Sequence, residues 1–324
     1  MRPLRPLVLL ILPVLAGAVE VAWPTAMPRP DIRRPETFVQ PAASGTVESG
    51  MFGMTRNDGT RFHEGLDIRP LAHDGRGEAV DLVRAALPGR VAYLCVRATG
   101  PYGRYIVLEH PESGLPAYSL YAHLASVRGD LMVGAVVRAG QPLGVLGRSS
   151  GDEPIPRERA HLHFEIGLRL SDGFDSWRLR QPELRREDNP HGNFHGWNLA
   201  GLDPLPLLGK KTVDLQTVVN DLPAALVVKV RTRRTPDFVR RHPQLVTGSA
   251  VGAAGWEVEL TWHGLPKRWK PLLEGAPGLP ASGWRIDAVK EQERVRLERR
   301  QMLAKGTNTP GVTLKRTMEL AIGP

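Results

Sequence analysis

Cysteine is almost absent from this 324-residue sequence, which contains only Cys95. An intramolecular disulfide is therefore impossible, and zinc fingers that need several cysteine ligands are excluded. Cys95 lies in the apolar stretch 91–96, a setting typical of a small buried hydrophobic residue. Charged residues make up 24% of the chain and hydrophobic residues 41%, which indicates a globular protein and excludes a disordered chain or a multi-span membrane protein.

Lysine is absent from residues 1–209, which hold 23 Arg against 23 Asp plus Glu and so carry no net charge. Residues 210–324 hold 20 Lys plus Arg against 11 acidic residues, and therefore carry the whole net charge of +9. A basic surface of this kind can meet nucleic acid, membrane phosphates or an anionic cell wall. No stacking or base-reading motif accompanies the charge, so we do not expect nucleic-acid binding.

Glycine and proline are frequent instead, with 34 and 29 residues. This composition argues against a helical bundle and favours a mainly β fold with many turns. We expect the strands of the N-terminal two thirds at residues 46–52, 90–96, 104–109, 118–124, 143–147 and 161–168.

The N-terminus has the pattern of a secretory signal peptide, predicted over residues 1–18. Arg2 and Arg5 precede an apolar run, which ends near the small residues Ala16-Gly17-Ala18. The run is too short for a comfortable transmembrane helix. Cleavage after Ala18 would leave an exported protein, periplasmic or associated with the cell envelope, with no transmembrane span; the alternative is an uncleaved interfacial anchor.

Composition changes along the chain predict the domain boundaries. Residues 19–44 are rich in proline and predict a stiff linker, with the folded part beginning near Gly45. Lysine first appears at residue 210, where we place a second boundary. Residues 45–209 would then form one domain, with an extension from about residue 171. Residues 210–324 would form a small basic accessory domain, α+β or β, with strands near 225–232 and 256–262 and an exposed helix or hairpin at 287–303.

Three histidine clusters follow one another along the first of these domains. They are His63-Glu64-Gly65-Leu66-Asp67, Ser119-Leu120-Tyr121-Ala122-His123 and His161-Leu162-His163-Phe164-Glu165. Side chains alternate between the two faces of a strand, so the third cluster predicts its two histidines and Glu165 on one polar face. By the same rule residues 119, 121 and 123 share a polar face. Gly65 permits a sharp turn that lets His63 and Asp67 converge.

Two imidazoles and one carboxylate form a ligand set that suits Zn²⁺, and three protein ligands leave the fourth position to water, as in catalytic sites. Further histidines beside the metal can act as acid, base or oxyanion stabiliser. A single His-x-His is weak support for such a site, and the alternative for each cluster is an ordinary strand or loop histidine. The three clusters together favour the metal site.

Together, the clusters resemble the motifs of the lysostaphin/LytM family of zinc metallopeptidases, over roughly residues 45–170. The resemblance implies a mainly antiparallel β fold, the duplicated hybrid motif, and cleavage of peptide bonds in bacterial cell-wall peptidoglycan. It also implies one zinc per chain, held by His63, Asp67 and His163, with His123 and His161 as catalytic histidines. The sequence differs from the family pattern in longer segments at 71–82 and 152–159, both expected near the rim of the cleft.

Several other polar residues have two interpretations. Tyr121 lines the cleft or is a half-buried strand residue, and Glu165 supports a ligand or is solvated. Glu64 is expected at the surface. His191 and His195 lie in a turn-rich segment and are expected to be loop residues rather than a second metal site.

The sequence therefore predicts an exported zinc endopeptidase that acts on peptidoglycan peptides. The alternative is a non-catalytic relative that binds the wall or activates another hydrolase. Such relatives lose metal ligands, whereas this chain keeps every motif position, which favours the enzyme. The basic C-terminal part is expected to meet anionic wall polymers.

Overall fold

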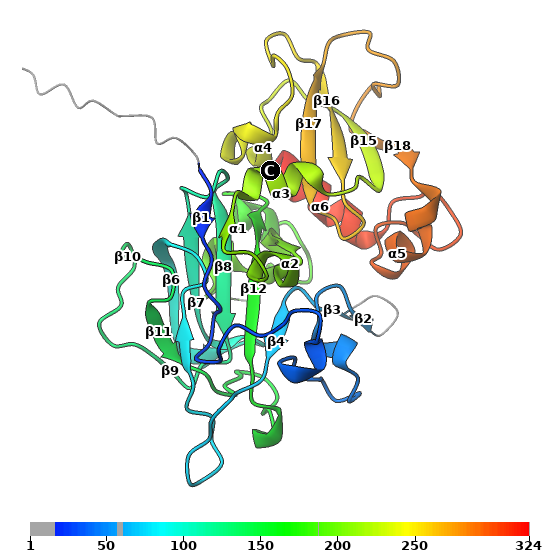
Figure 1. The fold of residues 1–324 in the computed structure, drawn as a ribbon. Coiled ribbons are helices and arrows are strands. Elements are labelled where there is room, and N and C mark those ends of the chain that lie inside the picture. Colours follow the sequence, from blue (N-terminus) through cyan, green and yellow to red (C-terminus); the bar gives the residue numbers. More distant parts are fainter. Residues whose placement is uncertain (1–16, 57–60, 187, 324) are drawn as a thin grey trace, which may run out of the picture.

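A computed structural model describes residues 17–56, 61–186 and 188–323 (Figure 1). A seven-stranded antiparallel sheet forms the centre of the N-terminal part, in the order β10-β6-β7-β8-β12-β13, with β4 also paired to β12. Its strands are β4 (Leu66–Ile68), β6 (Gly89–Thr99), β7 (Gly103–His110), β8 (Ala117–Ala122), β10 (Val136–Val137), β12 (Leu162–Arg169) and β13 (Leu199–Leu202). The predicted mainly β, antiparallel fold is confirmed.

Smaller sheets flank this one. They are the three-stranded sheet β5 (Leu82–Arg84), β11 (Pro142–Val145) and β9 (Ser126–Val127), and the pairs β1 (Val19–Glu20) with β14 (Thr212–Val213) and β2 (Thr55–Arg56) with β3 (Arg61–Phe62). Five of the six predicted strands coincide with β6, β7, β8, β11 and β12. The strand predicted at 46–52 is wrong, because residues 47–50 form a short 3₁₀ helix. There the Ser49 hydroxyl accepts from the backbone N–H of Ala42 at 2.8 Å, which satisfies the backbone locally.

The proline-rich segment 19–44, predicted as a stiff linker, contributes side chains to the core. Val21, Trp23, Phe38 and Val39 are all buried in the core. Val39 forms a β-bridge with Ile68 in β4, so the segment runs along the sheet that carries the first histidine cluster. Four apolar side chains among five prolines are enough to hold an extended segment on the domain. Most of the predicted signal, residues 1–16, lies outside the described residues.

The C-terminal part forms a four-stranded antiparallel sheet in the order β17-β16-β15-β18. Its strands are β15 (Leu226–Arg231), β16 (Gly255–Leu260), β17 (Pro266–Leu272) and β18 (Trp284–Val289), which confirms the two predicted strands. In β15 the residues 226, 228 and 230 are buried and their neighbours are half-buried, so one face packs on the core. The charge-dense segment 287–303 holds the end of β18 and the helix α5.

The helices are short except for the last one. They are α1 (Phe174–Arg178), α2 (Pro204–Leu208), α3 (Leu215–Asp221), α4 (Asp237–Arg241), α5 (Arg294–Arg299) and α6 (Val312–Ile322). Short 3₁₀ helices lie at 35–37, 47–50, 157–159, 192–194, 196–198, 243–245 and 291–293. Among the described residues, no helix has the length and apolar character needed to cross a membrane.

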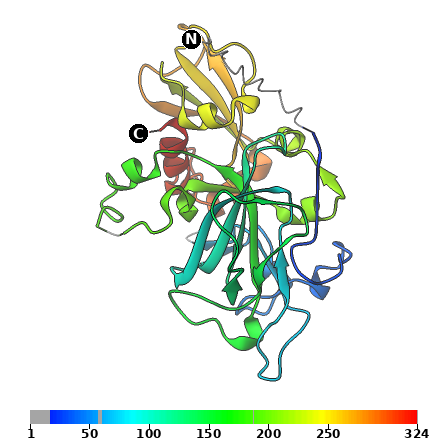
Figure 2. The ribbon, with the colours of Figure 1, turned by 90° about the vertical axis from the view of Figure 1, so that its left-hand side faces the viewer.

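Both parts of the chain share one apolar core. Helix α6 lies between the four-stranded sheet and the N-terminal part in both views (Figures 1 and 2). The indole N–H of Trp177 donates to the Glu319 carboxylate on α6 at 2.9 Å. Arg241 on α4 pairs with Glu109 of β7 and with Asp172. The predicted boundary near residue 209 therefore does not separate two independent surfaces.

A chain truncated after Gly209 is expected to aggregate or to melt at a much lower temperature than the full protein. It would expose the apolar surface now covered by α4 and α6, and each buried apolar side chain contributes about 1.5–3 kcal/mol. Since one kcal/mol corresponds to about 2–4 °C in a domain of this size, a decrease of more than about 10 °C is expected. Differential scanning calorimetry of both chains tests this, and equal melting temperatures would contradict it.

Candidate metal centre

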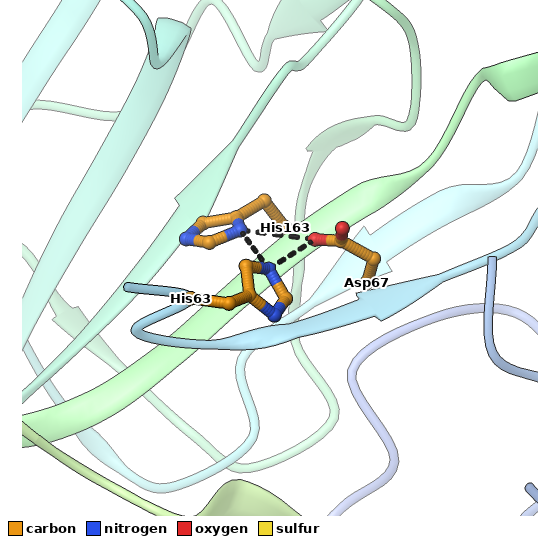
Figure 3. A group of neighbouring side chains, drawn as sticks. All are labelled: His63, Asp67 and His163. Carbon is orange, nitrogen blue, oxygen red and sulfur yellow. Dashed lines mark hydrogen bonds and ion pairs between the residues drawn. The ribbon is translucent and has the colours of Figure 1, made fainter. Parts of the chain in front are cut away.

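His63, Asp67 and His163 come together because of the strand register. His163 of β12 is paired directly with Asp67 of β4, and directly opposed residues have neighbouring side chains. His63 precedes β4 by a short turn and points at both of them (Figure 3). The turn requires Gly65, because a Cβ atom there would lie 2.5 Å from the Phe164 carbonyl oxygen. Their potential ligand atoms all lie within 4.8 Å of one another.

The spacing of these atoms fits one tetrahedral ion. Asp67 Oδ1 lies 3.1 Å from His63 Nε2 and 3.0 Å from His163 Nδ1, and the two nitrogens are 3.3 Å apart. Ligands about 2.0–2.1 Å from a tetrahedral zinc are separated by about 3.3 Å. Two imidazoles and one carboxylate are also ligands that zinc prefers. The residues present therefore fit a zinc ion.

Hydrogen bonds fix which nitrogen of each imidazole is available. His63 Nδ1 donates to the Met51 carbonyl at 2.8 Å, which leaves Nε2 free to bind a metal. His163 Nε2 donates to Glu165 Oε1 at 3.0 Å, which leaves Nδ1. An imidazole held in one tautomer by a carboxylate is the usual arrangement around a metal ligand.

Glu165 is completely buried, so it is not a solvated strand residue. Its position fits the alternative, that it supports a metal ligand. Its carboxylate also accepts the hydroxyls of Tyr102, at 2.6 Å, and of Tyr118, at 2.9 Å. Burial raises the pKa of this carboxyl, but the bonds from His163, Tyr102 and Tyr118 outweigh burial and lower it. The two tyrosines were not predicted from the sequence; Tyr102 lies in a turn without any motif.

Removing the phenol hydroxyl of Tyr102 should weaken metal binding without abolishing it. Tyr102→Phe leaves the Glu165 carboxylate with one bond fewer, and loss of such a supporting contact typically costs 10- to about 100-fold in metal affinity. Competition with a chromophoric zinc chelator measures the effect. Tyr93→Phe is the control, because Tyr93 donates to the Pro190 carbonyl and not to the site. Equal affinities of the two variants would contradict the supporting role.

His123 and His161 stand beside the three convergent residues. Their rings are 4.7 Å apart, and the His123 ring is 5.9 Å from that of His163. His161 Nε2 lies 3.6 Å from Asp67 Oδ1. The Nδ1 atoms donate to backbone carbonyls, that of Ser149 for His123 at 2.9 Å and that of Arg159 for His161 at 2.7 Å. Both rings therefore keep Nε2 free as a proton acceptor.

The prediction that residues 119, 121 and 123 share one polar face of a strand is wrong, although His123 does lie at the site. Strand β8 ends at Ala122, and His123 has a φ of 60°, which is uncommon for a residue other than glycine. Without this turn the imidazole would lie on the face of Tyr121. That face is core: Tyr121 is fully buried, packs against Phe164 and does not line a cleft. The site face of β8 instead carries Tyr118.

The pKa values of Asp67, His163, His123 and His161 are shifted in different ways by burial and by neighbouring charges. Burial opposes ionisation of Asp67, but His63, His161 and His163 outweigh it and hold its pKa well below the usual range. Burial likewise disfavours a charged His163, but Asp67 and Glu165 raise its pKa to about 10. Burial, with His161 and His163 nearby, lowers the pKa of His123 to about 3, and burial lowers the pKa of His161. A metal at Nδ1 of His163 would therefore displace a proton, whereas the two flanking histidines are neutral.

Three further residues complete the comparison with the sequence. Glu64 is not at the surface: it is half-buried and lines a pocket between the two parts of the chain. His191 and His195 lie apart from the site, as expected for loop residues. His191 contacts the Tyr105 hydroxyl through Nδ1 at 2.6 Å, and His195 stacks on Phe174. Among the described residues, only His63, Asp67 and His163 form a group that can hold a metal ion.

The two segments that lengthen the family pattern are connected to each other. Glu78, in the segment 71–82, accepts two bonds of 2.9 Å from Arg148 and one of 3.2 Å from Arg157 in the segment 152–159. Both segments project at the lower end of Figure 1. They follow Asp67 and precede His161 in the chain, so this ion pair ties together two segments that adjoin the site.

Residues 61–173 match the sequence model of peptidase family M23. Among curated proteins, no sequence matches the chain significantly. A putative glycyl-glycine endopeptidase LytM from Ruminococcus gnavus is a similar solved structure, with 24% identity and a TM-score of 0.30 over 45% of this chain. The chain spans only 46% of that protein's length. The catalytic domain of lysostaphin from Staphylococcus simulans has 18% identity and a TM-score of 0.30, over 56% of this chain and 98% of that one. A zinc-containing peptidase from Vibrio cholerae has 22% identity and a TM-score of 0.27, over 40% of this chain and 34% of that one.

Proposed function

Because residues 61–173 match the sequence model of peptidase family M23, we propose that this protein is a zinc-dependent metalloendopeptidase. The observation that carries the proposal is the pairing of a His-Asp-His ligand set with two further histidines that are neutral and keep Nε2 free. A non-catalytic metal site has no need for two such bases. Zinc bound by His63, Asp67 and His163 would lower the pKa of a bound water to about 7 and polarise a carbonyl.

The flanking histidines would move the protons of the reaction. His123 and His161 are both suited to accept a proton, since each has Nδ1 bound to a carbonyl and Nε2 free. One would take the proton of the attacking water, and the other would protonate the leaving amine or stabilise the oxyanion. Glu165 would hold the imidazole of His163 in its ligand tautomer throughout.

The proposed substrates are the peptides of bacterial peptidoglycan, and the proposed location is outside the cytoplasm. The motif resemblance to the lysostaphin/LytM family and the signal-like N-terminus support these two points. Elemental analysis of the purified protein, combined with mass spectrometry of digested peptidoglycan, tests them. One zinc per chain and newly released peptide fragments are expected. Zinc without fragments would favour the alternative, a wall-binding or hydrolase-activating protein.

The C-terminal part is proposed to hold the enzyme on an anionic wall. Exposed basic side chains are spread over it, at Lys270, Lys290, Arg299, Lys305 and Lys315. Such an attraction is screened over about 8 Å at physiological salt. Sedimentation of the full protein with isolated sacculi should therefore decrease steeply as salt is raised. Binding that does not change across the salt series would refute the electrostatic role.

A further inference from the structure

A pocket of about 140 Å³ lies between the two parts of the chain. Unlike the candidate metal centre, it is built by both parts. The N-terminal part contributes Phe62, Glu64 and Trp197, and the C-terminal part contributes His263, Arg300 and Arg316. Its volume exceeds what a single water needs, so the pocket can hold several waters or one small ion.

Two guanidinium groups are held in this pocket by aromatic rings. Arg300 lies over the ring of Phe62 at 4.0 Å, and Arg316, on α6, lies over the ring of Trp197 at 4.6 Å. Stacking fixes the plane of a guanidinium and leaves its N–H donors at the edge free for a ligand. Burial lowers the pKa of Arg300 to about 10 and also lowers the pKa of Arg316.

Protein groups do not satisfy these donors. Within the part of the chain that the structure describes, Arg300 donates only one long bond, of 3.4 Å, to the His263 carbonyl. Arg316 makes no hydrogen bond and no ion pair with any residue in the described ranges. Elsewhere in the described chain, buried or half-buried arginines such as Arg169 and Arg241 are paired with carboxylates. Each guanidinium has five donors, so most of the donors in this pocket have no protein acceptor.

The pocket also carries an excess of positive charge. Glu64 is its one carboxylate among the lining residues, against two arginines. Burial, with Arg300 and Arg296 nearby, lowers the pKa of His263 to about 3, so this ring adds no charge. Thr317, which follows Arg316 on α6, also lines the pocket. Paired arginines over aromatic rings are suited to the planar or tetrahedral oxygens of carboxylate, sulfate and phosphate groups.

We propose that this pocket, formed by Arg300, Arg316 and Thr317 opposite Trp197, is a binding site for a small oxyanion. The ligand is a carboxylate or a tetrahedral oxyanion, and its binding ties α6 to the N-terminal part. The pocket adjoins the contacts that support the candidate metal centre, because Glu64 follows His63 in the chain and a Cβ atom at Gly196 would lie 3.2 Å from the Tyr102 hydroxyl. The proposal does not rest on peptidase activity.

Isothermal titration of the zinc-loaded, full-length protein tests the site with three probes. Sulfate represents a tetrahedral oxyanion, N-acetyl-D-alanine a carboxylate, and N-acetyl-D-alanine amide is the neutral control. We expect the first or the second to bind and the amide not to bind. Arg316→Met keeps the apolar stem over Trp197 but removes the charge, and should weaken oxyanion binding by about tenfold or more. Which probe binds more tightly identifies the oxyanion geometry.

Two further variants make the test specific. Arg296→Met is the matched control, because Arg296 stacks on Trp262 at 3.8 Å in the same region but does not line the pocket. It should bind the probe as the parent does. Glu64→Gln removes the competing negative charge and should tighten binding severalfold. The proposal is overturned if neither oxyanion binds, if Arg316→Met and Arg296→Met bind equally, or if Glu64→Gln weakens binding. Zinc content and melting temperature, measured for every variant, confirm that each remains folded.

Discussion

Purified His163→Ala protein is expected to contain no zinc after desalting, whereas the parent contains one per chain. His163 supplies one of three ligand atoms, and two protein ligands rarely hold zinc against dilution. Zinc binding to a full set of ligands has a free energy of roughly 10–16 kcal/mol. The loss of one ligand should therefore lower the affinity for zinc by more than about a hundredfold. Inductively coupled plasma mass spectrometry, scaled to protein concentration, measures the loss.

A control is needed because this substitution also disturbs buried charge. Without the imidazole, Glu165 keeps only its two tyrosine bonds, and Asp67 loses a partner at 3.0 Å. His191→Ala removes a histidine of the same domain, outside the site, and should leave the zinc content unchanged. Chelator-treated parent protein gives the melting temperature expected for a folded chain without the ion. Full zinc occupancy in His163→Ala would show that the ligand set is a different one.

Zinc uptake should become weaker as the pH is lowered, because a ligand of the proposed site carries a proton. The pKa of His163 is raised to about 10, so the folded site holds a proton at neutral pH that zinc must displace. Affinity should therefore decrease as pH is lowered, with proton release on binding. Titration in buffers of different ionisation enthalpy measures this release. Zinc uptake without any proton release would contradict the assigned ligand atom.

The convergence of side chains at the candidate metal centre could partly be predicted from the sequence, because some of its geometry follows from local rules. His163 and Glu165 lie two residues apart on β12, and His161 forms a β-bridge just before the strand, so their pattern depends only on the period of two. The requirement for Gly65 could also be recognised, since a turn separates His63 from Asp67 by only three residues. Which strands become neighbours is not encoded in such patterns. The direct pairing of His163 with Asp67 comes from the antiparallel sheet as a whole.

Other features escaped prediction because they depend on tertiary contacts. The left-handed backbone of His123 is imposed by its surroundings, where its N–H donates to the Tyr102 carbonyl at 3.0 Å. Phe38 and Val39 are two apolar residues among prolines, and only the presence of β4 beside them makes that segment part of the core. The sequence predicts Glu64 at the surface because Arg300 and Arg316, whose charges interact with its carboxylate across the pocket, lie more than two hundred residues away in the chain.

His123→Ala and His161→Ala are each expected to keep zinc and the fold while losing about 10²- to 10⁴-fold in the rate of peptide hydrolysis. Neither ring is one of the three mutually convergent groups, so the ligand set survives each substitution. Each ring is anchored by one Nδ1 bond to a carbonyl, and losing that bond costs much less than losing a ligand. Initial rates of fragment release from soluble peptidoglycan peptides, followed by chromatography, measure the loss.

The two variants also separate the two proton-transfer roles. Both histidines are half-buried and have lowered pKa values, so neither is distinguished by its charge state. His161 Nε2 lies 3.6 Å from Asp67 Oδ1, one of the atoms that would hold the ion, so His161 would be placed to accept the proton of the attacking water. We therefore expect the larger loss in kcat for His161→Ala with an amide substrate. An ester substrate, whose leaving group needs little protonation, should restore more activity to the variant that lacks the general acid. The catalytic assignment of either histidine is wrong if its alanine variant, with full zinc content, hydrolyses the peptides at the parent rate.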